Sequence, residues 1–404
     1  MIPFEEALAH VMKHVPSPRH EQVPLEEAVG RVLAEEIRAP RDLPPWNNSA
    51  MDGFAVRAAD VTAATPANPF RLVVLETVAA GAMPSCRVET GEAIRIMTGA
   101  PMPEGADAVV IVEETEPGPD GDILIHSGVA PGENVRLKGE DVTEGQLMMP
   151  PGTLLRPGHI GMLASFGRSQ LRVTRRPVVG ILSTGDELVE VDQAPGPDKI
   201  INVNSHALAA QVKESGAIPV RLGIAKDTRE ATREGIREGL NCDILLISGG
   251  VSMGDFDYVR EIMSELGGGL TFWKVRMKPA RPLAFGPVSG VPTFGLPGNP
   301  VSSMVSFEVF VRPFIKKWMG HTHIERPVVQ AALTEKVSKK PGRRFFLRAL
   351  VENDGNGSYT CRTTGDQGSG VLTSMMLAEG LMELSEELDG PLQPGTRVPV
   401  RLLA

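Results

Sequence analysis

The fold is decided by three stretches of the chain: Gly180-Ile-Leu-Ser-Thr-Gly-Asp-Glu-Leu188, Ile247-Ser-Gly-Gly-Val-Ser-Met-Gly-Asp-Phe-Asp-Tyr258 and Phe294-Gly-Leu-Pro-Gly-Asn-Pro-Val-Ser-Ser303. Each begins with an apolar, strand-like run and continues into glycines, hydroxyl groups and carboxylates. Parallel α/β sheets bind ligands at the carboxyl ends of their strands, where the backbone bends sharply and approaches the ligand. The three stretches therefore predict the rim of a phosphate site.

An alternation of strand and helix surrounds these stretches, from Val178 to Met319. Strands are predicted at residues 178–182, 219–224, 244–248 and 291–296, and helices at 205–215, 228–240, 258–266 and 300–318. Asp227 followed by Glu230 suggests a capping-box helix start, and Gly216 suggests a helix stop. Alternation of this kind predicts a three-layer α/β/α domain, with a parallel sheet covered by helices on both faces.

The segments on either side of this alternation have different patterns of apolar residues. Helical spacing of apolar residues at 3–14 and 24–37 predicts a small helical entry segment, and Pro157 to Phe166 predicts another helix. Short strands are expected at 70–75, 93–97, 108–112 and 123–125, and again beyond Pro327, where they indicate a small β-barrel or sandwich. The predicted domains are residues 1–46 with 145–176 (helical and linker, discontinuous), 47–144 (β-rich), 177–325 (α/β) and 326–404 (β-barrel).

Composition narrows the class of protein. The chain has 404 residues and a formal net charge of −9, which argues against a nucleic-acid groove or an anionic membrane surface as the main partner. The N-terminus is acidic and no apolar run reaches membrane-spanning length, so a cytoplasmic protein is expected. Three scattered cysteines, Cys86, Cys242 and Cys361, provide neither a disulfide framework nor a zinc knuckle.

Each of the three strand-end loops can be explained in two ways. Ser183 to Glu187 could hold a phosphate and a metal, or form a tight turn whose Asp caps the next element. Ser248 to Asp257 has the glycine density of an anion nest, although Asp255 or Asp257 could simply cap a helix. The third loop, Leu296 to Ser303, leads into a helix start that can receive an anion, but Pro-Gly-Asn-Pro alone is an ordinary turn.

A run of basic residues lies between the second and third loops. Strand alternation would place Lys274, Arg276 and Lys278 on one face, which fits a polyanion, with a solvated strand face as the alternative. Carboxylates beside the same anion would repel it unless a hard cation lies between them, so we infer Mg²⁺. The chain has no Gly-x-x-x-x-Gly-Lys-Ser/Thr, clear Gly-x-Gly-x-x-Gly or nucleophile-elbow pattern, which disfavours P-loop, nicotinamide and α/β-hydrolase enzymes.

Seven motifs, taken together and in order, match a known family. They are Ser49-Ala-Met-Asp-Gly-Phe-Ala55, Met97-Thr-Gly-Ala100, Gly139-Glu-Asp141, Ser183-Thr-Gly-Asp-Glu-Leu188, Ser248-Gly-Gly-Val-Ser252, Lys278-Pro279 and Leu296-Pro-Gly-Asn-Pro300. Each motif alone has little specificity, but the ordered set is very specific and spans nearly the whole chain. The sequence closely resembles molybdopterin molybdenumtransferase, the MoeA family, which includes the gephyrin E domain. The resemblance implies that the α/β domain is MogA-like.

The resemblance also implies an activity: molybdate is inserted into adenylylated molybdopterin with Mg²⁺, AMP is released, and the molybdenum cofactor is formed. It implies a homodimer whose active site draws on both chains. The adenylyltransferase of the same pathway and downstream molybdoenzymes are candidate protein partners.

The family pattern assigns residues to the site. Its acids and hydroxyl, carried over as catalytic residues, fall on Asp52, Thr98, Asp141, Glu187, Asp227 and Asp257, of which Glu187 and Asp257 are the metal ligands. The implied substrate contacts are Arg136, Ser183, Thr184, Gly185, Ser248, Gly249, Gly250, Ser252, Lys274, Lys278, Pro297, Gly298, Asn299 and Pro300, with Ser369 or Ser374 from the tail.

Two other functions use the same residues. One is a molybdopterin adenylyltransferase, against which the extra β-rich domains and the Asp52 segment argue. The other is a non-catalytic scaffold or carrier that binds molybdopterin and partner proteins, against which the full set of acids argues. Tungstate, an oxyanion of nearly the same size and charge as molybdate, remains an alternative substrate.

Overall fold

The computed structural model describes residues 1–251 and 258–403. The chain forms two compact units. The first contains Met1–Ala34, Leu154–Arg156 and Gln170–Ala404, and the second contains Glu35–Thr153 and Pro157–Ser169. None of the helices in the described ranges is long and apolar enough to cross a membrane. The finer division into four domains stays a prediction.

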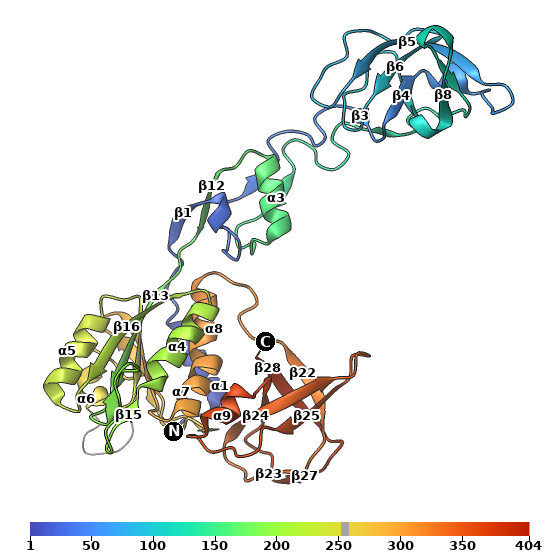
Figure 1. Cartoon of the computed structure of the whole chain (residues 1–404). Helices are drawn as coiled ribbons and strands as arrows, with labels where there is room; N and C mark the ends of the chain where they lie inside the picture. The colour runs from blue at the N-terminus through green and yellow to red at the C-terminus, as the bar shows by residue number, and fades with distance from the viewer. Residues whose placement is uncertain (252–257, 404) are drawn as a thin grey trace. The chain divides into compact units, whose positions relative to one another are not determined.

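A six-stranded sheet forms the α/β part of the first unit, with the helices α1 (Phe4–Lys13), α7 (Pro300–Ser306) and α8 (Arg312–Trp318) between it and the C-terminal barrel strands (Figure 1). Four neighbouring strands run parallel, as the alternation predicts. Two further strands extend this sheet in antiparallel pairing, which makes the sheet mixed rather than purely parallel. In spatial order the strands are β16 (Ile218–Ala225), β13 (Val178–Thr184), β17 (Ile244–Ser248), β21 (Val291–Leu296), β20 (Ala284–Val288) and β18 (Phe272–Trp273).

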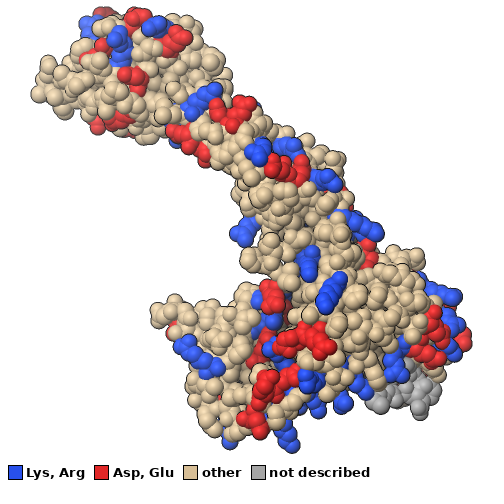
Figure 2. Space-filling model, turned by 180° about the vertical axis from the view of Figure 1, so that it is seen from behind, with Lys and Arg blue, Asp and Glu red and all other residues tan. Residues whose placement is uncertain are grey.

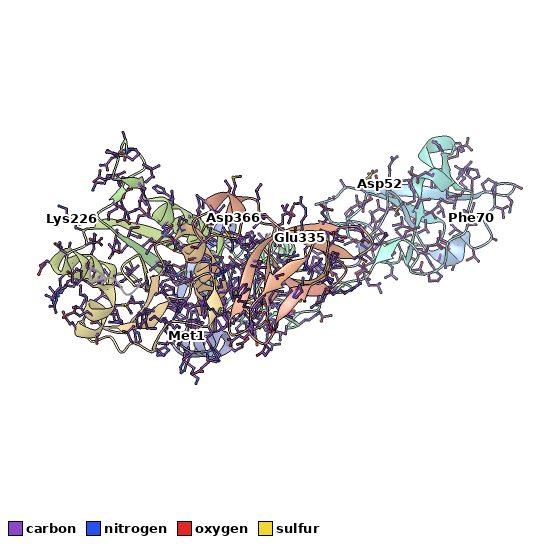
Figure 3. The ribbon with its side chains drawn as sticks, turned by 90° about the horizontal axis from the view of Figure 1, so that it is seen from below. Met1, Asp52, Phe70, Lys226, Glu335 and Asp366 are labelled. Carbon is purple, nitrogen blue, oxygen red and sulfur yellow. The ribbon has the colours of Figure 1, made fainter. Side chains whose placement is uncertain are left out.

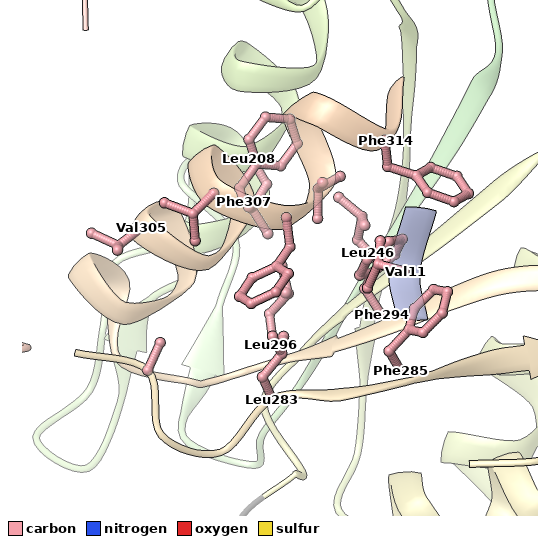
Figure 4. Packing of buried hydrophobic residues seen from close by; sticks show 14 of the residues in the cluster. Val11, Leu208, Leu246, Leu283, Phe285, Phe294, Leu296, Val305, Phe307 and Phe314 are labelled. Atoms are coloured by element: carbon pink, nitrogen blue, oxygen red, sulfur yellow. The ribbon is translucent and has the colours of Figure 1, made fainter. Parts of the chain in front are cut away.

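Helices cover both faces of this sheet because its strands are apolar on both sides. Along β17, Ile244 and Leu246 belong to one buried cluster, whereas Leu245 and Ile247 belong to another. The first cluster is rich in phenylalanine, and Figure 4 shows Phe285, Phe294 and Phe314 converging in it. The helices are α4 (Val203–Glu214), α5 (Arg229–Gly239), α6 (Val259–Glu265), and a continuous run of α7 (Pro300–Ser306), a π-helical turn η4 (Phe307–Val311) and α8 (Arg312–Trp318).

The helix ends correct one prediction and agree with another. The predicted capping residue of α5, Asp227, is wrong, because Thr228 is the N-cap and its side chain accepts a hydrogen bond from the Ala231 N–H. Asp227 instead exchanges hydrogen bonds with Asp186. Gly216, which follows the C-cap of α4, has φ +93°, the left-handed geometry expected at a helix stop.

The N-terminal helix α1 (Phe4–Lys13) forms as predicted and packs into the phenylalanine-rich cluster of the α/β sheet. The helix predicted over 24–37 is wrong. That segment has only a short 3-10 turn, η1 (Leu25–Glu27), after which Gly30 adopts φ +76° and Val32 and Leu33 form β-bridges with Leu154 and Val173. Strands β1 (His20–Pro24) and β12 (Gln170–Thr174) pair in the same region. Apolar residues four positions apart are compatible with a helix, but here the apolar side chains are buried by pairing with distant segments of the chain.

The second unit is β-rich. Its main sheet contains β7 (Ala108–Ile111), β4 (Gly53–Val56), β6 (Glu92–Ile96), β5 (Phe70–Val78), β9 (Ile123–Ile125) and β8 (Thr115–Pro117) in that order. Two small pairs are β3 (Asn48–Ser49) with β10 (Val135–Arg136), and β2 (Ile37–Arg38) with β11 (Leu147–Met149). The remaining elements are α2 (Ala58–Val61), η2 (Val112–Glu114), η3 (Pro119–Gly121) and the predicted helix α3 (Pro157–Ser165).

The C-terminal region of the first unit is a closed barrel of five strands, because β24 pairs with both β25 and β26. Phe346 and Leu381 from this barrel belong to the same buried cluster as the α/β sheet. The barrel strands are β22 (Val328–Leu333), β24 (Arg344–Asn353), β25 (Tyr359–Thr363), β26 (Gly380–Leu384) and β28 (Arg397–Leu402). Added to them are β19 (Met277–Lys278), β23 (Val337–Lys339), β27 (Gly390–Leu392) and the helix α9 (Leu372–Met376).

Charges of both signs are interspersed over the face of the protein seen in Figure 2, where Lys and Arg side chains alternate with Asp and Glu. The view shows no broad area of basic residues.

A substitution at Gly249 tests how closely the backbone after β17 must approach the end of β13. A Cβ atom at this position would lie 2.6 Å from the Thr184 carbonyl oxygen, and the backbone has φ +102°. Gly81 is a matched control, because it has φ +87° and nothing within 4 Å of its Cβ position. In urea denaturation we expect Gly81→Ala to cost about 1 kcal/mol through its backbone conformation, and Gly249→Ala roughly 3 kcal/mol or more because of the added clash. Equal losses would contradict this packing.

Candidate functional site

A cavity of about 490 Å³ lies at the carboxyl ends of β13, β17 and β21. All three predicted strand-end loops contribute to its walls, so the structure brings them together. The predicted site residues that line it are Ser183, Thr184, Gly185, Glu187, Asp227, Ser248, Gly249, Gly250, Pro297, Gly298, Asn299 and Pro300. Leu188, Ile200 and Ile201 add an apolar wall. A planar group with a phosphate chain could lie in such a cavity, with its ring against the aliphatic side chains.

Asn204 joins two of the loops. It lies in the first turn of α4 and is 9% exposed. Its Nδ2 donates to the Ser248 Oγ at 2.8 Å and to the Gly298 carbonyl at 2.7 Å. Only the amide nitrogen can donate to a carbonyl, so this contact also fixes the orientation of the carboxamide. One side chain therefore holds the end of β17 against the loop that follows β21.

Asn202 connects the end of β13 to the start of α4. Its Oδ1 accepts hydrogen bonds from the Ser183 Oγ at 3.0 Å and from the Ser205 N–H at 3.3 Å, the second of which caps α4. Sequence reasoning missed both asparagines. The signal was present as Asn202-Val-Asn204-Ser205 just before an apolar helical run. Asparagine is a common helix cap, and its short side chain can form hydrogen bonds with neighbouring backbone groups.

Two acidic side chains, Glu187 and Asp227, line the cavity from the loops after β13 and β16. Asp227 accepts a hydrogen bond from the Asp186 N–H, and the Asp186 carboxylate accepts one from the Asp227 N–H, both at 3.2 Å. These reciprocal contacts tie the two loops. The Glu187 carboxylate folds back over Gly185, where an added Cβ would lie 2.6 Å from Glu187 Oε2.

This donor set fits Mg²⁺. Mg²⁺ is commonly held by one or two carboxylates together with phosphate oxygens of the substrate and water. Glu187 and Asp227 supply hard oxygen donors at the wall of the cavity. Within residues 1–251 and 258–403, no group of three or more His, Cys, Asp or Glu side chains forms a closed protein cage for a metal. The two predicted residues Ser252 and Asp257, one of them the second predicted metal ligand, lie outside the described residues.

The tail contributes Ser369 to the third loop. Its hydroxyl accepts a hydrogen bond from the Asn299 Nδ2 at 3.0 Å, and its carbonyl accepts one from the Val301 N–H at 3.2 Å. That N–H of the α7 start is therefore engaged within the protein. Ser374 is buried and differently placed, because its hydroxyl contacts the Nε of Arg348 at 3.1 Å and donates to the Val371 carbonyl. Of the two tail serines, Ser369 is the one that contacts a cavity-lining residue.

The predicted single strand with Lys274, Arg276 and Lys278 on one face is wrong. The segment divides between β18 and β19, which belong to different sheets. Lys274 has φ +77°, which interrupts the strand alternation. Its ammonium lies over Trp273, whereas that of Lys278 lies 5.1 Å from the Phe345 ring centre, in a separate hollow with Lys340 and Arg343.

In the β-rich unit, two predicted residues meet directly. Asp52 Oδ1 accepts hydrogen bonds from the Thr98 N–H at 2.7 Å and the Thr98 Oγ1 at 2.8 Å. These bonds, the backbone one first, lower the pKa of the Asp52 carboxyl, with a smaller contribution from Arg95. Asp52 is therefore held as a carboxylate on an exposed loop of this unit, where it is labelled in Figure 3.

Arg136 and Asp141 lie in the same unit. Arg136 is an exposed residue of β10 and pairs with Asn48 of β3, four residues before Asp52. The Ala50 N–H donates to the Asn134 carbonyl, and the Ser49 N–H to that of Ala100, so the Asp52, Thr98 and Arg136 loops are tied together. The Asp141 N–H donates to the Leu43 carbonyl at 3.1 Å, and its side chain is exposed.

Three family models match the chain in order. They are the MoeA N-terminal region (domains I and II) at residues 2–167, a probable molybdopterin binding domain at 180–317, and the MoeA C-terminal region (domain IV) at 330–403. The cavity residues from Ser183 to Pro300 all fall within the second match.

Relatives match over nearly the full length. Molybdopterin molybdenumtransferase 2 of Mycobacterium tuberculosis is 38% identical over 374 residues, which cover 91% of each chain. Molybdopterin molybdenumtransferase of Bacillus subtilis is 36% identical over 406 residues, covering 100% of this chain and 94% of the relative. The crystal structure of a molybdopterin biosynthesis moeA protein from Pyrococcus horikoshii OT3 has a TM-score of 0.84, 33% identity and full coverage of both chains.

The fold and cavity define a multidomain protein built on a molybdopterin-binding type of α/β domain, with a β-rich unit and a C-terminal β-barrel. The chain belongs to the MoeA family of molybdopterin molybdenumtransferases, which are transferase enzymes.

We predict that Asn204→Ala separates the two loops that this side chain joins. The change removes a buried hydrogen bond to Ser248 and a partly buried one to the Gly298 carbonyl, and should cost roughly 1–3 kcal/mol of unfolding free energy. Turnover should fall further than stability alone explains, because Ser248 and Gly298 lose their common anchor. Asn241→Ala is the control, since Asn241 is exposed and its Nδ2 bonds only to the Glu238 carbonyl. Unfolding and turnover measurements on both variants check this, and equal behaviour would refute the anchoring role.

We also predict that Thr98→Val raises the pKa of Asp52, because one of two hydrogen bonds to the charged form is lost. A depressed pKa in the folded state stabilises the fold above the ordinary carboxyl pKa, and this contribution disappears as the pH falls through the folded value. Carboxyl ¹³C NMR titration measures the shift. Thr90→Val, which alters a hydroxyl bonded to Arg57, should leave Asp52 unchanged. An identical Asp52 titration in Thr98→Val would contradict the assignment.

Proposed function

We propose that this protein inserts molybdate into adenylylated molybdopterin and releases AMP, in a reaction that depends on Mg²⁺ and forms the molybdenum cofactor. The observation that carries the proposal is a cavity at which hydroxyl groups and glycine backbone at the ends of β13, β17 and β21 meet carboxylates that follow β13 and β16. Full-length relatives that carry the name molybdopterin molybdenumtransferase support the substrate class.

The cavity residues have distinct tasks in this reaction. Ser248, Gly249 and Gly250 approach the phosphate groups closely because glycine leaves room beside the backbone. Glu187 and Asp227 would hold Mg²⁺ beside the phosphate oxygens. When bound, this ion supplies positive charge that polarises the phosphate linkage. Leu188, Ile200 and Ile201, which line the cavity, would lie against one side of the pterin.

Positive side chains offset the charge of the two anionic substrates. The family pattern assigns this task to Lys274, Lys278 and Arg136. None of the three lines the cavity at the strand ends, and Lys278 lies in the separate hollow with Lys340 and Arg343. Asp52, held ionised by Thr98, is assigned to the site by the family pattern. We further propose a cytoplasmic homodimer with four domains. The enzyme that adenylylates molybdopterin and molybdoenzymes that receive the cofactor are its proposed protein partners.

Glu187→Gln tests the metal assignment. The amide preserves size but lacks the charge needed beside Mg²⁺, so AMP release should fall roughly a hundredfold or more. Glu230→Gln, on the exposed side of α5, is the matched control and should retain wild-type turnover. The measurement is AMP release from adenylylated molybdopterin, with and without molybdate and Mg²⁺.

The outcomes of that assay are distinct. Release that requires both molybdate and Mg²⁺ supports the proposal. Tight substrate binding without release would instead indicate a carrier. Formation of adenylylated molybdopterin from ATP would indicate the preceding adenylyl transfer. Near-normal turnover of Glu187→Gln would remove Glu187 from the metal site.

A further inference from the structure

Trp273, at the end of β18, makes three contacts with its indole group. Its Nε1–H donates to the Val251 carbonyl at 3.0 Å. The Lys274 Nζ lies 3.8 Å from the centre of the ring, and the Arg260 Cζ lies 4.4 Å from it. An indole is the strongest aromatic partner for a cation and has a single polar donor, so each contact uses a different property of this side chain.

The backbone beside the ring is in an uncommon conformation. Lys274 has φ +77°, a value that non-glycine residues adopt at a cost. Its N–H donates to the Leu283 carbonyl at 3.1 Å, and its own carbonyl accepts the Ile2 N–H at 3.2 Å. Strain of this kind persists only where surrounding contacts fix it and often accompanies functional side chains. Here it directs the Lys274 side chain back over the ring of its neighbour.

The same ring supports the edge of the cavity. Val251 is 3% exposed, lines the cavity and directly follows Gly249 and Gly250. Its side chain also packs on the β21 backbone, since a Cβ on Gly295 would lie 2.6 Å from Val251 Cγ1. Arg260 lies in α6, nine residues further along the chain. Trp273 thus joins the glycine segment, the start of α6 and a lysine assigned to the substrate.

We propose that Trp273 is a positioning residue for the transfer reaction: it sets the ammonium of Lys274 and anchors the Val251 end of the glycine segment. The inference rests on the proposed function. The ring needs no contact with substrate for this role, because its effect passes through Lys274 and Val251. Replacing it should change the rate through the placement of a charge rather than through loss of the fold.

A double-mutant cycle between Trp273 and Lys274 tests the proposal. Trp273→Leu removes the cation contact and the N–H donor, and should lower kcat/KM for AMP release by roughly tenfold or more. Trp273→Phe retains an aromatic face and should lose less. In a Lys274→Met background, the Lys274-dependent part of the loss must disappear, so the second substitution should have a much smaller effect. Trp318→Phe, a buried tryptophan of α8, is the control and should retain wild-type kinetics.

A second readout does not require turnover. Lysines labelled with ¹³C-methyl groups give NMR signals, and the signal missing in Lys274→Arg identifies Lys274. Ring currents of Trp273 should shift this signal upfield in the wild type and not in Trp273→Leu. The inference would be overturned by an unshifted wild-type signal or by wild-type kinetics of Trp273→Leu. It would also be overturned if Trp273→Leu lowered kcat/KM by the same factor in the wild-type and Lys274→Met backgrounds. A wild-type protein that shows the NMR shift but releases no AMP would overturn the proposed function and the catalytic part of this inference, while retaining the contact.

Discussion

The hydrogen bonds from the Asn204 carboxamide are the contacts on which the site depends. The three strands β13, β17 and β21 end at one edge of the sheet because they run parallel. Asn204 holds Ser248, the last residue of β17, and Gly298, which follows β21, at hydrogen-bond distance, and Asn202 holds Ser183 near the end of β13. Both side chains come from the first residues of α4 and its cap. One helix start therefore organises three loops into one cavity.

Packing beneath the cavity makes this arrangement rigid. Residues from α1, the sheet, the helix run α7 to α8 and the barrel contribute to one buried cluster. Phe4 illustrates the connection, because its ring lies 5.1 Å from Phe310 and 5.2 Å from Phe346. The N-terminus and the C-terminal barrel are thereby joined to the sheet that carries the loops. Polar loops can stay close together only when the strands before them are fixed in this way.

Much of the fold could be predicted because the alternation of apolar strands and helices is strong between Val178 and Met319. The strand-end loops were predicted for the same reason, since glycine and carboxylates follow apolar runs there. The antiparallel strands β18 and β20 were not predicted, and β18 in particular has only two residues, which carry too little pattern. The helix over 24–37 was wrong since spacing alone does not reveal that distant strands bury Val32 and Leu33. The prediction that Lys274, Arg276 and Lys278 share one strand face was wrong because Lys274 has a positive φ, which local composition does not reveal.

The candidate site was predicted less completely than the fold. The residue types of the loop from Ser183 to Glu187 indicate chemistry, so Glu187 could be found from the sequence, whereas Asp227 was assigned to the site only by the family resemblance. Asn202 and Asn204 act by connecting segments that are far apart in the chain, and such connections are visible only in three dimensions. The separation of Lys278 from the main cavity likewise depends on β19 pairing with the barrel strand β24.

The central claim is that three strand ends form one substrate cavity. A crystal structure with adenylylated molybdopterin, obtained without molybdate, tests it most directly. The account predicts density for the phosphate groups beside Ser248, Gly249 and Gly250, with the pterin against Leu188 and Ile201. Density for the whole ligand elsewhere in the protein, with these loops empty, would contradict it.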